Sequence, residues 1–415
     1  MKVERYKLPN GLTVLMYVDR TVPLVTYHTW FKVGSRDEQP GYTGIAHLFE
    51  HMMFKGAKRY GPKEFDKVIQ SNGGTNNAFT SHDYTGYFET LPSDKLELMI
   101  DLESDRMENL QISEANLKSE REVVKEERRY RVENDVTGRL FEETYATVFK
   151  VHPYRWPVIG WMEDLDRITV EKCLEFYKTY YAPNNAVVVI AGDFDKSNAK
   201  KLIEKYYGHM KSQPIPSRAV AAEPKQEAAR EHVFERDVQS DYMTVAFQNA
   251  QAGQPDYYAL DVLALILGEG PSSRLYKRLV YDTQLASSVG VSNSASKDPG
   301  LFSVTVALKP GVSQKRVERI VYDEIRHART SLYSEFEIQK AKNAIMTMNV
   351  GMLKTVYGKA QSLAFNEVVM GSYEYLFKDL ERYNKVTAAQ IQRAATAVLD
   401  NSRRNLIVQK AKVTR

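Results

Sequence analysis

The sequence has a single cysteine, Cys173, among its 415 residues. One cysteine cannot form an intramolecular disulfide, and it cannot supply a metal site that is rich in thiolates. A fold held together by disulfides and a Cys-rich metal site are therefore both excluded.

The sequence also lacks an apolar run of the ~18–20 residues that a membrane-spanning helix needs. Its N-terminal residues lack the apolar core of a signal peptide. We therefore expect a soluble cytoplasmic chain, or a periplasmic one if a signal peptide had been removed.

No large excess of charge is present either, because 57 basic residues and 53 acidic residues leave a net charge of +4. This balance gives no reason to expect nucleic acid or an anionic membrane as a partner.

The length and composition indicate a globular protein of more than one domain. A chain of 415 residues is too long for a single core, and 43% hydrophobic with 27% charged residues is ordinary for soluble domains. The stretch from Lys211 to Arg230 combines prolines, small residues and charges without periodicity, which is typical of a linker. We therefore predict a first domain over 1–212, a linker over 213–230 and a second domain over 231–415.

The most informative stretch runs from Gly44 to Phe54 and reads GIAHLFEHMMF. Its apolar residues recur at near-helical spacing and predict a buried or half-buried helix, with Thr43 as its N-cap. His47 and His51 are four residues apart and share one helix face, and Glu50 points to the same side. Two imidazoles and a nearby carboxylate provide two zinc ligands and a base for a water molecule. The order H-x-x-E-H is that of the inverted zincins. The alternative is a core helix that happens to carry two histidines.

A third ligand is available in the charged run that begins at Ser119. The composition of this run is strongly helical. Glu120 and Glu127 are two helical turns apart, and we expect them to share a face with Val123 and Val124. The alternative is a solvated helix held by salt bridges. Spacing alone does not choose among Glu120, Glu126 and Glu127.

These motifs resemble the pitrilysin/insulysin family of zinc metallopeptidases, particularly its short subunits similar to mitochondrial processing peptidase. In that family the third ligand is a Glu about 76 residues after the second motif histidine, which is the position of Glu127. A helper Glu stands one heptad earlier, where this chain has Glu120. The resemblance thus implies one Zn²⁺ per chain, held by His47, His51 and Glu127.

The fold that the resemblance implies is α+β. It consists of two homologous α/β domains, each an antiparallel sheet with packed helices, that form one half of a clamshell. A second such chain would close a chamber with it. The second half of the sequence repeats the first in outline, which suggests an internal duplication. The helix expected over 256–267 takes the place of the motif helix but contains no His or Glu, so one half looks catalytic and the other structural.

The stretch after Asn72 predicts two strands that meet near His82 and Asp83. In the resembling family the strand that carries Asn77 and Ala78 is an exposed edge beside the metal. A peptide substrate adds to this edge as an extra strand through main-chain hydrogen bonds. The alternative is a plain hairpin within a sheet.

The second half departs from the family pattern at two positions. The family has a substrate-clamping Arg and Tyr seven residues apart, and counting on from Arg274 places Val280 and Ser287 there. The resemblance implies that a homologous partner supplies the Arg and Tyr in a heterodimer. The alternatives are a homodimer, or compensation by Arg278, Tyr276 or Tyr281.

We therefore predict a zinc-dependent endopeptidase that acts on peptides or unfolded segments. Glu50 would be the general base, and Glu120 would tune or orient the site. The alternative, of a different class, is a non-catalytic scaffold subunit of the same fold. Such subunits usually lose one of the His or Glu residues of the motif, and this chain has all four.

Overall fold

The computed structural model describes residues 1–217 and 220–412, and the chain divides into two compact units. The first unit comprises Met1–Arg128, Trp156–Val220 and Gly351–Leu376, and the second comprises Arg129–Arg155, Ala221–Val350 and Phe377–Arg415. Neither unit is continuous in sequence, so the division differs from the continuous domains expected over 1–212 and 231–415. The difference has a physical cause, because the helices within 129–155 and 351–376 bury their apolar faces on the sheet of the other half.

The first unit is built on a six-stranded sheet with the strand order β1-β2-β6-β3-β5-β4. Neighbouring strands are antiparallel except for β2 and β6, which are parallel. The two strands expected to meet near His82 are present as β4 and β5. In sheet order, the strands are β1 (Glu4–Lys7), β2 (Thr13–Val18), β6 (Ala186–Gly192), β3 (Leu24–Phe31), β5 (Thr85–Pro92) and β4 (Thr75–Thr80).

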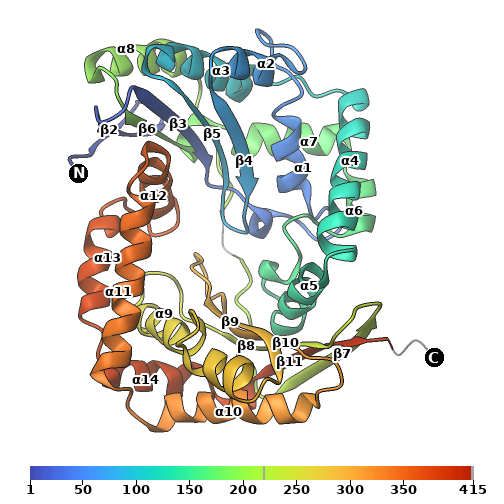
Figure 1. The fold of residues 1–415 in the computed structure, drawn as a ribbon. Coiled ribbons are helices and arrows are strands. Elements are labelled where there is room, and N and C mark those ends of the chain that lie inside the picture. The colour runs from blue at the N-terminus through green and yellow to red at the C-terminus, as the bar shows by residue number, and fades with distance from the viewer. Residues whose placement is uncertain (218–219, 413–415) are drawn as a thin grey trace. The chain divides into compact units, whose positions relative to one another are not determined.

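Helices cover both faces of this sheet (Figure 1). On one face, α12 contacts β3 and β6, where Leu363 of the helix shares a core with Trp30 and Val189 of the strands. On the other face, α3 contacts β3 and β5 and also packs against α8. The helices of the unit are α1 (Ile45–Met52), α2 (Glu64–Ser71), α3 (Leu96–Asn109), α4 (Glu114–Arg128), α6 (Met162–Arg167), α7 (Val170–Tyr180), α8 (Lys196–Tyr207) and α12 (Val356–Val368).

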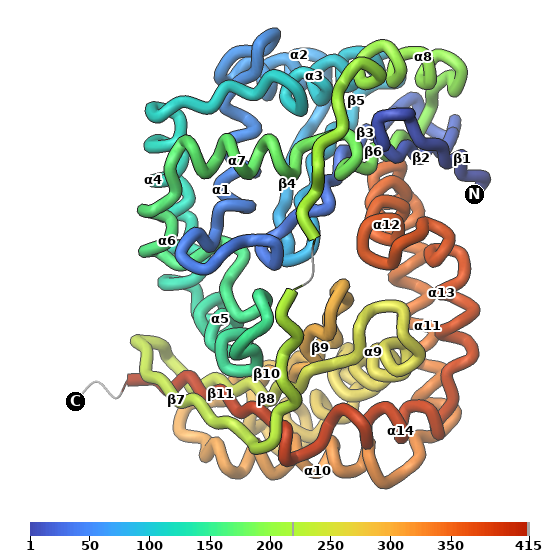
Figure 2. Tube along the Cα trace, turned by 180° about the vertical axis from the view of Figure 1, so that it is seen from behind, coloured from blue at the N-terminus to red at the C-terminus, as the bar shows by residue number. Residues whose placement is uncertain are grey.

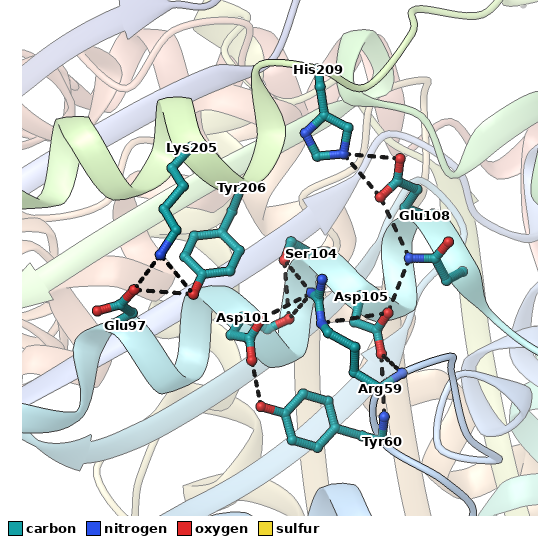
Figure 3. A network of polar contacts seen from close by, with 11 residues as sticks. Arg59, Tyr60, Glu97, Asp101, Ser104, Asp105, Glu108, Lys205, Tyr206 and His209 are labelled. Carbon is teal, nitrogen blue, oxygen red and sulfur yellow. Dashed lines mark hydrogen bonds and ion pairs between the residues drawn. The ribbon is translucent and has the colours of Figure 1, made fainter.

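A polar network fixes the segment between α1 and α2 against α3 (Figure 3). The carboxylate of Asp105, which is fully buried, accepts the backbone N–H of Arg59 at 2.7 Å and that of Tyr60 at 3.3 Å. The Tyr60 hydroxyl donates to Asp101 at 2.5 Å, and the Arg59 guanidinium donates to Ser104 at 3.1 Å. The chain that leaves the motif helix is therefore held in one place.

The second unit is built on a five-stranded sheet with the order β7-β11-β8-β10-β9. The pair β7 and β11 is parallel, and the remaining neighbours are antiparallel. This is the same order and sense as β2-β6-β3-β5-β4, so the two units repeat one topology. Figure 2 traces these strands from behind. In sheet order, they are β7 (Arg230–Arg236), β11 (Asn405–Ala411), β8 (Tyr242–Gln248), β10 (Leu301–Leu308) and β9 (Ala286–Asn293).

One face of the second sheet is covered by α9, α10 and α14, and α5 packs on the opposite face, where Tyr145 and Val148 meet Ala246 and Leu301. The helix α9 takes the place of the motif helix, because it follows β8 as α1 follows β3. Within the described residues, no helix combines the length and the apolar character that crossing a bilayer requires. The remaining helices are α5 (Val136–Val148), α9 (Pro255–Gly268), α10 (Gln314–Thr330), α11 (Glu335–Met352), α13 (Tyr375–Asn384) and α14 (Ala388–Val398).

Candidate metal centre

The motif helix α1 begins after Gly44, which has a φ of 87° and is in the left-handed region. A Cβ at this position would lie 2.6 Å from the carbonyl oxygen of Ile159, so the backbone conformation and the close approach both favour glycine. The buried carboxylate of Glu38 accepts the backbone N–H groups of Gly44 and Ala46 at 3.0 and 2.9 Å. Glu38 therefore satisfies amide donors that a helix N-terminus leaves open.

The expectation that Thr43 caps this helix is wrong. In the structure the N-cap residue is Gly44, which has no side chain that could cap the helix. The Thr43 hydroxyl instead donates to Asp164 at 2.7 Å. The carboxylate of Glu38, which comes from an earlier turn of the chain, takes over the capping. Sequence proximity alone did not indicate this tertiary contact.

The packing of α1 orients its histidines. Phe49 lies among Phe176, Tyr177 and Tyr181, with ring centroids 4.6–5.7 Å apart, and this aromatic contact fixes one face of the helix. The opposite side of the helix carries His47 and His51, and it contacts α4.

Three side chains converge between α1 and α4. The ligand atoms of His47, His51 and Glu127 all lie within 4.8 Å of one another. Glu127 Oε2 is 3.7 Å from His47 Nε2 and 3.2 Å from His51 Nε2. The structure thus brings together the three residues that the resemblance implies as a ligand set.

The spacing of these atoms fits a zinc ion. Zinc binds His nitrogen and carboxylate oxygen at about 2.0–2.2 Å in tetrahedral geometry, which places neighbouring ligand atoms about 3.3 Å apart. The distances of 3.2 and 3.7 Å straddle that value. Two imidazoles and one carboxylate are also a ligand set that catalytic zinc sites use. Among the candidates left open by spacing, Glu126 is exposed and Glu120 lies outside the cluster.

Glu120 occupies the other side of the His51 ring. Its Oε2 lies 3.5 Å from His51 Nδ1, and its Oε1 pairs with Lys55 Nζ. Burial raises the pKa of the Glu120 carboxyl, but His51 and Lys55 outweigh burial and lower it overall. Burial lowers the pKa of His51, but Glu120 and Glu127 outweigh it and raise this pKa to about 9. The carboxylates of Glu120 and Glu127 therefore create a strong negative field at His51.

Of the two valines expected on the same face of α4 as Glu120 and Glu127, only one is buried. Val124 is buried beside Glu120, whereas Val123 is 47% exposed. The apolar side of α4 is therefore narrower than the pattern suggested. Leu117, Val124 and Arg128 are the buried residues that accompany Glu120.

Glu50 is only 9% exposed and lies beside the strand β4. The hydroxyl of Thr80 donates to Glu50 Oε2 at 2.5 Å. This short contact orients the carboxylate, which lies on the same helix as the two histidines.

The strand β4 is the last strand of the first sheet, so one of its edges has no strand partner among the described residues. Ala78 N–H donates to the side-chain Oδ1 of Asn77 at 2.9 Å, which places this donor outside the ladder with β5. The helix α1 contacts β4. Asn77 and Ala78 therefore lie on an open sheet edge, on a strand that touches the motif helix.

Val280 and Ser287 both lie in the second unit. Val280 is in the π-helix Tyr276–Asp282 and packs against the core of that unit. The Ser287 hydroxyl donates to the carbonyl of Ala307 at 3.3 Å. Of the residues considered as replacements for the family Arg and Tyr, Arg278 pairs with Glu324 at 2.7 Å, and Tyr281 is 74% exposed.

The comparison with known proteins agrees with the geometry of this site. The family model described as insulinase, peptidase family M16, matches residues 13–160, and the model described as peptidase M16 inactive domain matches residues 167–345. The chain is 31% identical over 398 residues to the zinc protease PqqE of Helicobacter pylori, with 94% of this chain and 89% of that protein covered. The chain belongs to the M16 peptidase family. The resemblance noted from the motifs is therefore confirmed.

Two further similar proteins extend the comparison. A protease from Helicobacter pylori of known crystal structure has a TM-score of 0.94 and 29% identity, and the match covers 99% of both chains. A probable mitochondrial-processing peptidase subunit beta of Arabidopsis thaliana is 26% identical, over 85% of this chain and 70% of that protein. The M16 match over 13–160 contains the three motif residues His47, Glu50 and His51 and the third ligand candidate Glu127.

Sequence reasoning missed three residues that hold this site. Glu38 caps the motif helix, Thr80 contacts Glu50, and Lys55 contacts Glu120. A signal existed for Thr80, because it is two residues from Ala78 and so shares its side of the strand. Glu38 gave no periodic signal, since its contact depends on the turn between β3 and α1.

Proposed function

We propose that this chain is a zinc-dependent endopeptidase that cleaves peptides or unfolded segments. The observation that carries the proposal is the convergence of His47, His51 and Glu127 beside Glu50. The names of the M16 relatives, which include zinc protease, support it. We propose one zinc ion per chain, held by these three ligands.

The side chains around the ligands would each have a defined task. A zinc ion bound there would supply a Lewis acid and lower the pKa of a water molecule toward neutrality. Glu50 would accept a proton from the attacking water and return it to the nitrogen of the leaving amine. Thr80 would hold Glu50 Oε2 through its 2.5 Å hydrogen bond during both transfers. Glu120 would orient His51 from the Nδ1 side.

The open edge of β4 supports strand addition as the way in which substrate binds. An extended peptide would pair with the main chain at Ala78 and continue the first sheet. The Asn77 side chain that now accepts Ala78 N–H would be displaced by a substrate carbonyl. Main-chain pairing selects an extended conformation more than a particular side chain, which is consistent with peptides or unfolded segments as substrates.

Metal dependence is the experiment that tests this function. The purified chain, loaded with zinc, is incubated with a mixed library of quenched fluorogenic peptides, and its bound metal is quantified. We expect close to one zinc per chain and hydrolysis that a chelator abolishes and added zinc restores. Absence of tightly bound metal would contradict the proposal.

A proline at Ala78 tests the edge strand separately. Ala78→Pro removes the outward N–H without removing a ladder bond to β5, and edge strands tolerate proline in that orientation. Loss of one main-chain hydrogen bond to substrate is worth about 1–1.5 kcal/mol, so we expect KM to rise by roughly 10-fold. Ala78→Ser keeps the N–H and serves as the control. Equal KM values in both variants would argue against strand addition at this position.

A second candidate function is favoured by one observation. Val280 and Ser287 stand where the family has its substrate-clamping Arg and Tyr. A chain that binds zinc but does not hydrolyse peptides alone would be one subunit of a heterodimer whose homologous partner supplies these two groups. A chain that neither binds zinc nor gains activity with a homologous M16 subunit would be a scaffold subunit of the same fold.

A further inference from the structure

Lys55 lies four residues after His51, in the turn that ends the motif helix. The backbone fixes its position, because Lys55 N–H donates to Met52 at 3.0 Å and Gln111 N–H donates to the carbonyl of Gly56 at 3.0 Å. Its ammonium group pairs with Glu120 Oε1. The other oxygen of the same carboxylate faces His51 Nδ1 at 3.5 Å. The contacts form a chain from Lys55 through Glu120 to His51.

The geometry divides the two nitrogens of His51 between two carboxylates. Nδ1 faces Glu120, and Nε2 faces Glu127 and the position that a metal would take. A hydrogen bond from Nδ1–H to Glu120 leaves the lone pair of Nε2 directed at the metal. The orientation of the Glu120 carboxylate therefore decides how well His51 can act as a ligand.

We propose that Lys55 is a positioning residue of the metal centre, which holds the Glu120 carboxylate so that it can orient His51. The inference rests on the proposed zinc site. The Glu120 side chain is only 6% exposed, and a buried carboxylate needs a charged partner to keep one orientation. Without the Lys55 ammonium, the carboxylate loses the contact that holds Oε1 and is free to turn away from His51.

Two opposite effects of removing Lys55 have to be separated. Loss of a positive charge near a cation site would strengthen zinc binding through simple Coulomb attraction. Loss of the positioned carboxylate would weaken it, because outer partners of a metal ligand are worth about 10–100-fold in metal affinity. We expect the loss of the positioned carboxylate to outweigh the loss of the positive charge, so that removing Lys55 weakens zinc binding through Glu120.

The test is a double-mutant cycle on zinc affinity. Lys55→Met and Lys55→Arg are each made in the natural chain and in a Glu120→Gln background, and the zinc dissociation constant is measured by competition with a fluorescent chelator. We expect Lys55→Met to weaken zinc binding by about 10-fold, the lower end of the range for outer partners. Lys55→Arg, which keeps the charge and the donor, should bind zinc nearly as the natural chain does. In the Glu120→Gln background, Lys55→Met should have little further effect.

Two results would overturn the proposal. The first is zinc binding by Lys55→Met that equals or exceeds that of the natural chain. The second is a loss of affinity that is the same in the Glu120→Gln background, which would mean that Lys55 acts independently of Glu120. Thermal unfolding of the metal-free variants identifies any general loss of folding, and ¹⁵N chemical shifts of His51 report whether Nδ1 keeps its proton. A natural chain that binds zinc but cleaves no peptide, either alone or together with a homologous M16 subunit, would contradict the proposed function and leave this cycle interpretable.

Discussion

Replacing Glu50 with glutamine is expected to reduce peptide hydrolysis by about 10²–10⁴-fold, the usual contribution of a positioned general base. Glutamine has nearly the same shape and keeps an oxygen that can accept the Thr80 hydroxyl, which now donates at 2.5 Å. It cannot accept a proton from water at neutral pH. The change should therefore remove the proton transfer and leave the site around it in place.

The measurement compares kcat and bound zinc in the same preparations. In Glu50→Gln we expect zinc to stay near one per chain, because Glu50 is not part of the cluster formed by His47, His51 and Glu127. Glu122→Gln, a change at a solvent-exposed position of α4, is the matched control and should keep full activity. If Glu50→Gln retained activity within a few-fold of the natural chain, Glu50 would not be the general base.

The sequence predicted the part of the site that lies within one helix. A spacing of four residues places His47 and His51 on one face whatever the rest of the fold does, and the structure has them so. Spacing could not identify the third ligand in the same way, because it left Glu120, Glu126 and Glu127 as candidates. The choice depends on how α4 lies against α1, which is a tertiary contact that no local pattern contains.

The fold shows the same difference between local patterns, which the sequence predicted, and tertiary contacts, which it did not predict. The two strands expected to meet near His82 and Asp83 are present as β4 and β5. The two units were expected to be continuous, yet α5 and α12 each belong to the unit of the other half. An amphipathic helix shows that it must bury one face but not which sheet receives it.

The way in which the motif helix α1 begins also depends on tertiary contacts. Thr43 was the expected N-cap because threonine is a good local acceptor, but Asp164 binds its hydroxyl and Glu38 serves the helix instead. Both carboxylates come from segments outside the helix. Local propensity thus predicted that the helix exists, and long-range contacts decided how it begins.

Removing one of the three ligands is expected to have the largest effect on metal binding. A protein zinc site of four ligands binds with about 10–16 kcal/mol, so one ligand is worth on the order of 3 kcal/mol, or about 100-fold in affinity. His51→Ala should lose at least this much, because it also removes the ring that faces both Glu120 and Glu127. His47→Ala and Glu127→Ala should behave alike if the three residues form one site.

Calorimetric titration of the metal-free chain with zinc measures this loss directly. His209→Ala is the matched control, because His209 is an exposed histidine of the same unit that pairs with Glu108 at 3.0 Å, away from the cluster. It should bind zinc as the natural chain does. If His51→Ala kept the affinity and the one-to-one stoichiometry of the natural chain, the metal would have to be held elsewhere. The convergence of α1 and α4 would then serve only to pack two helices.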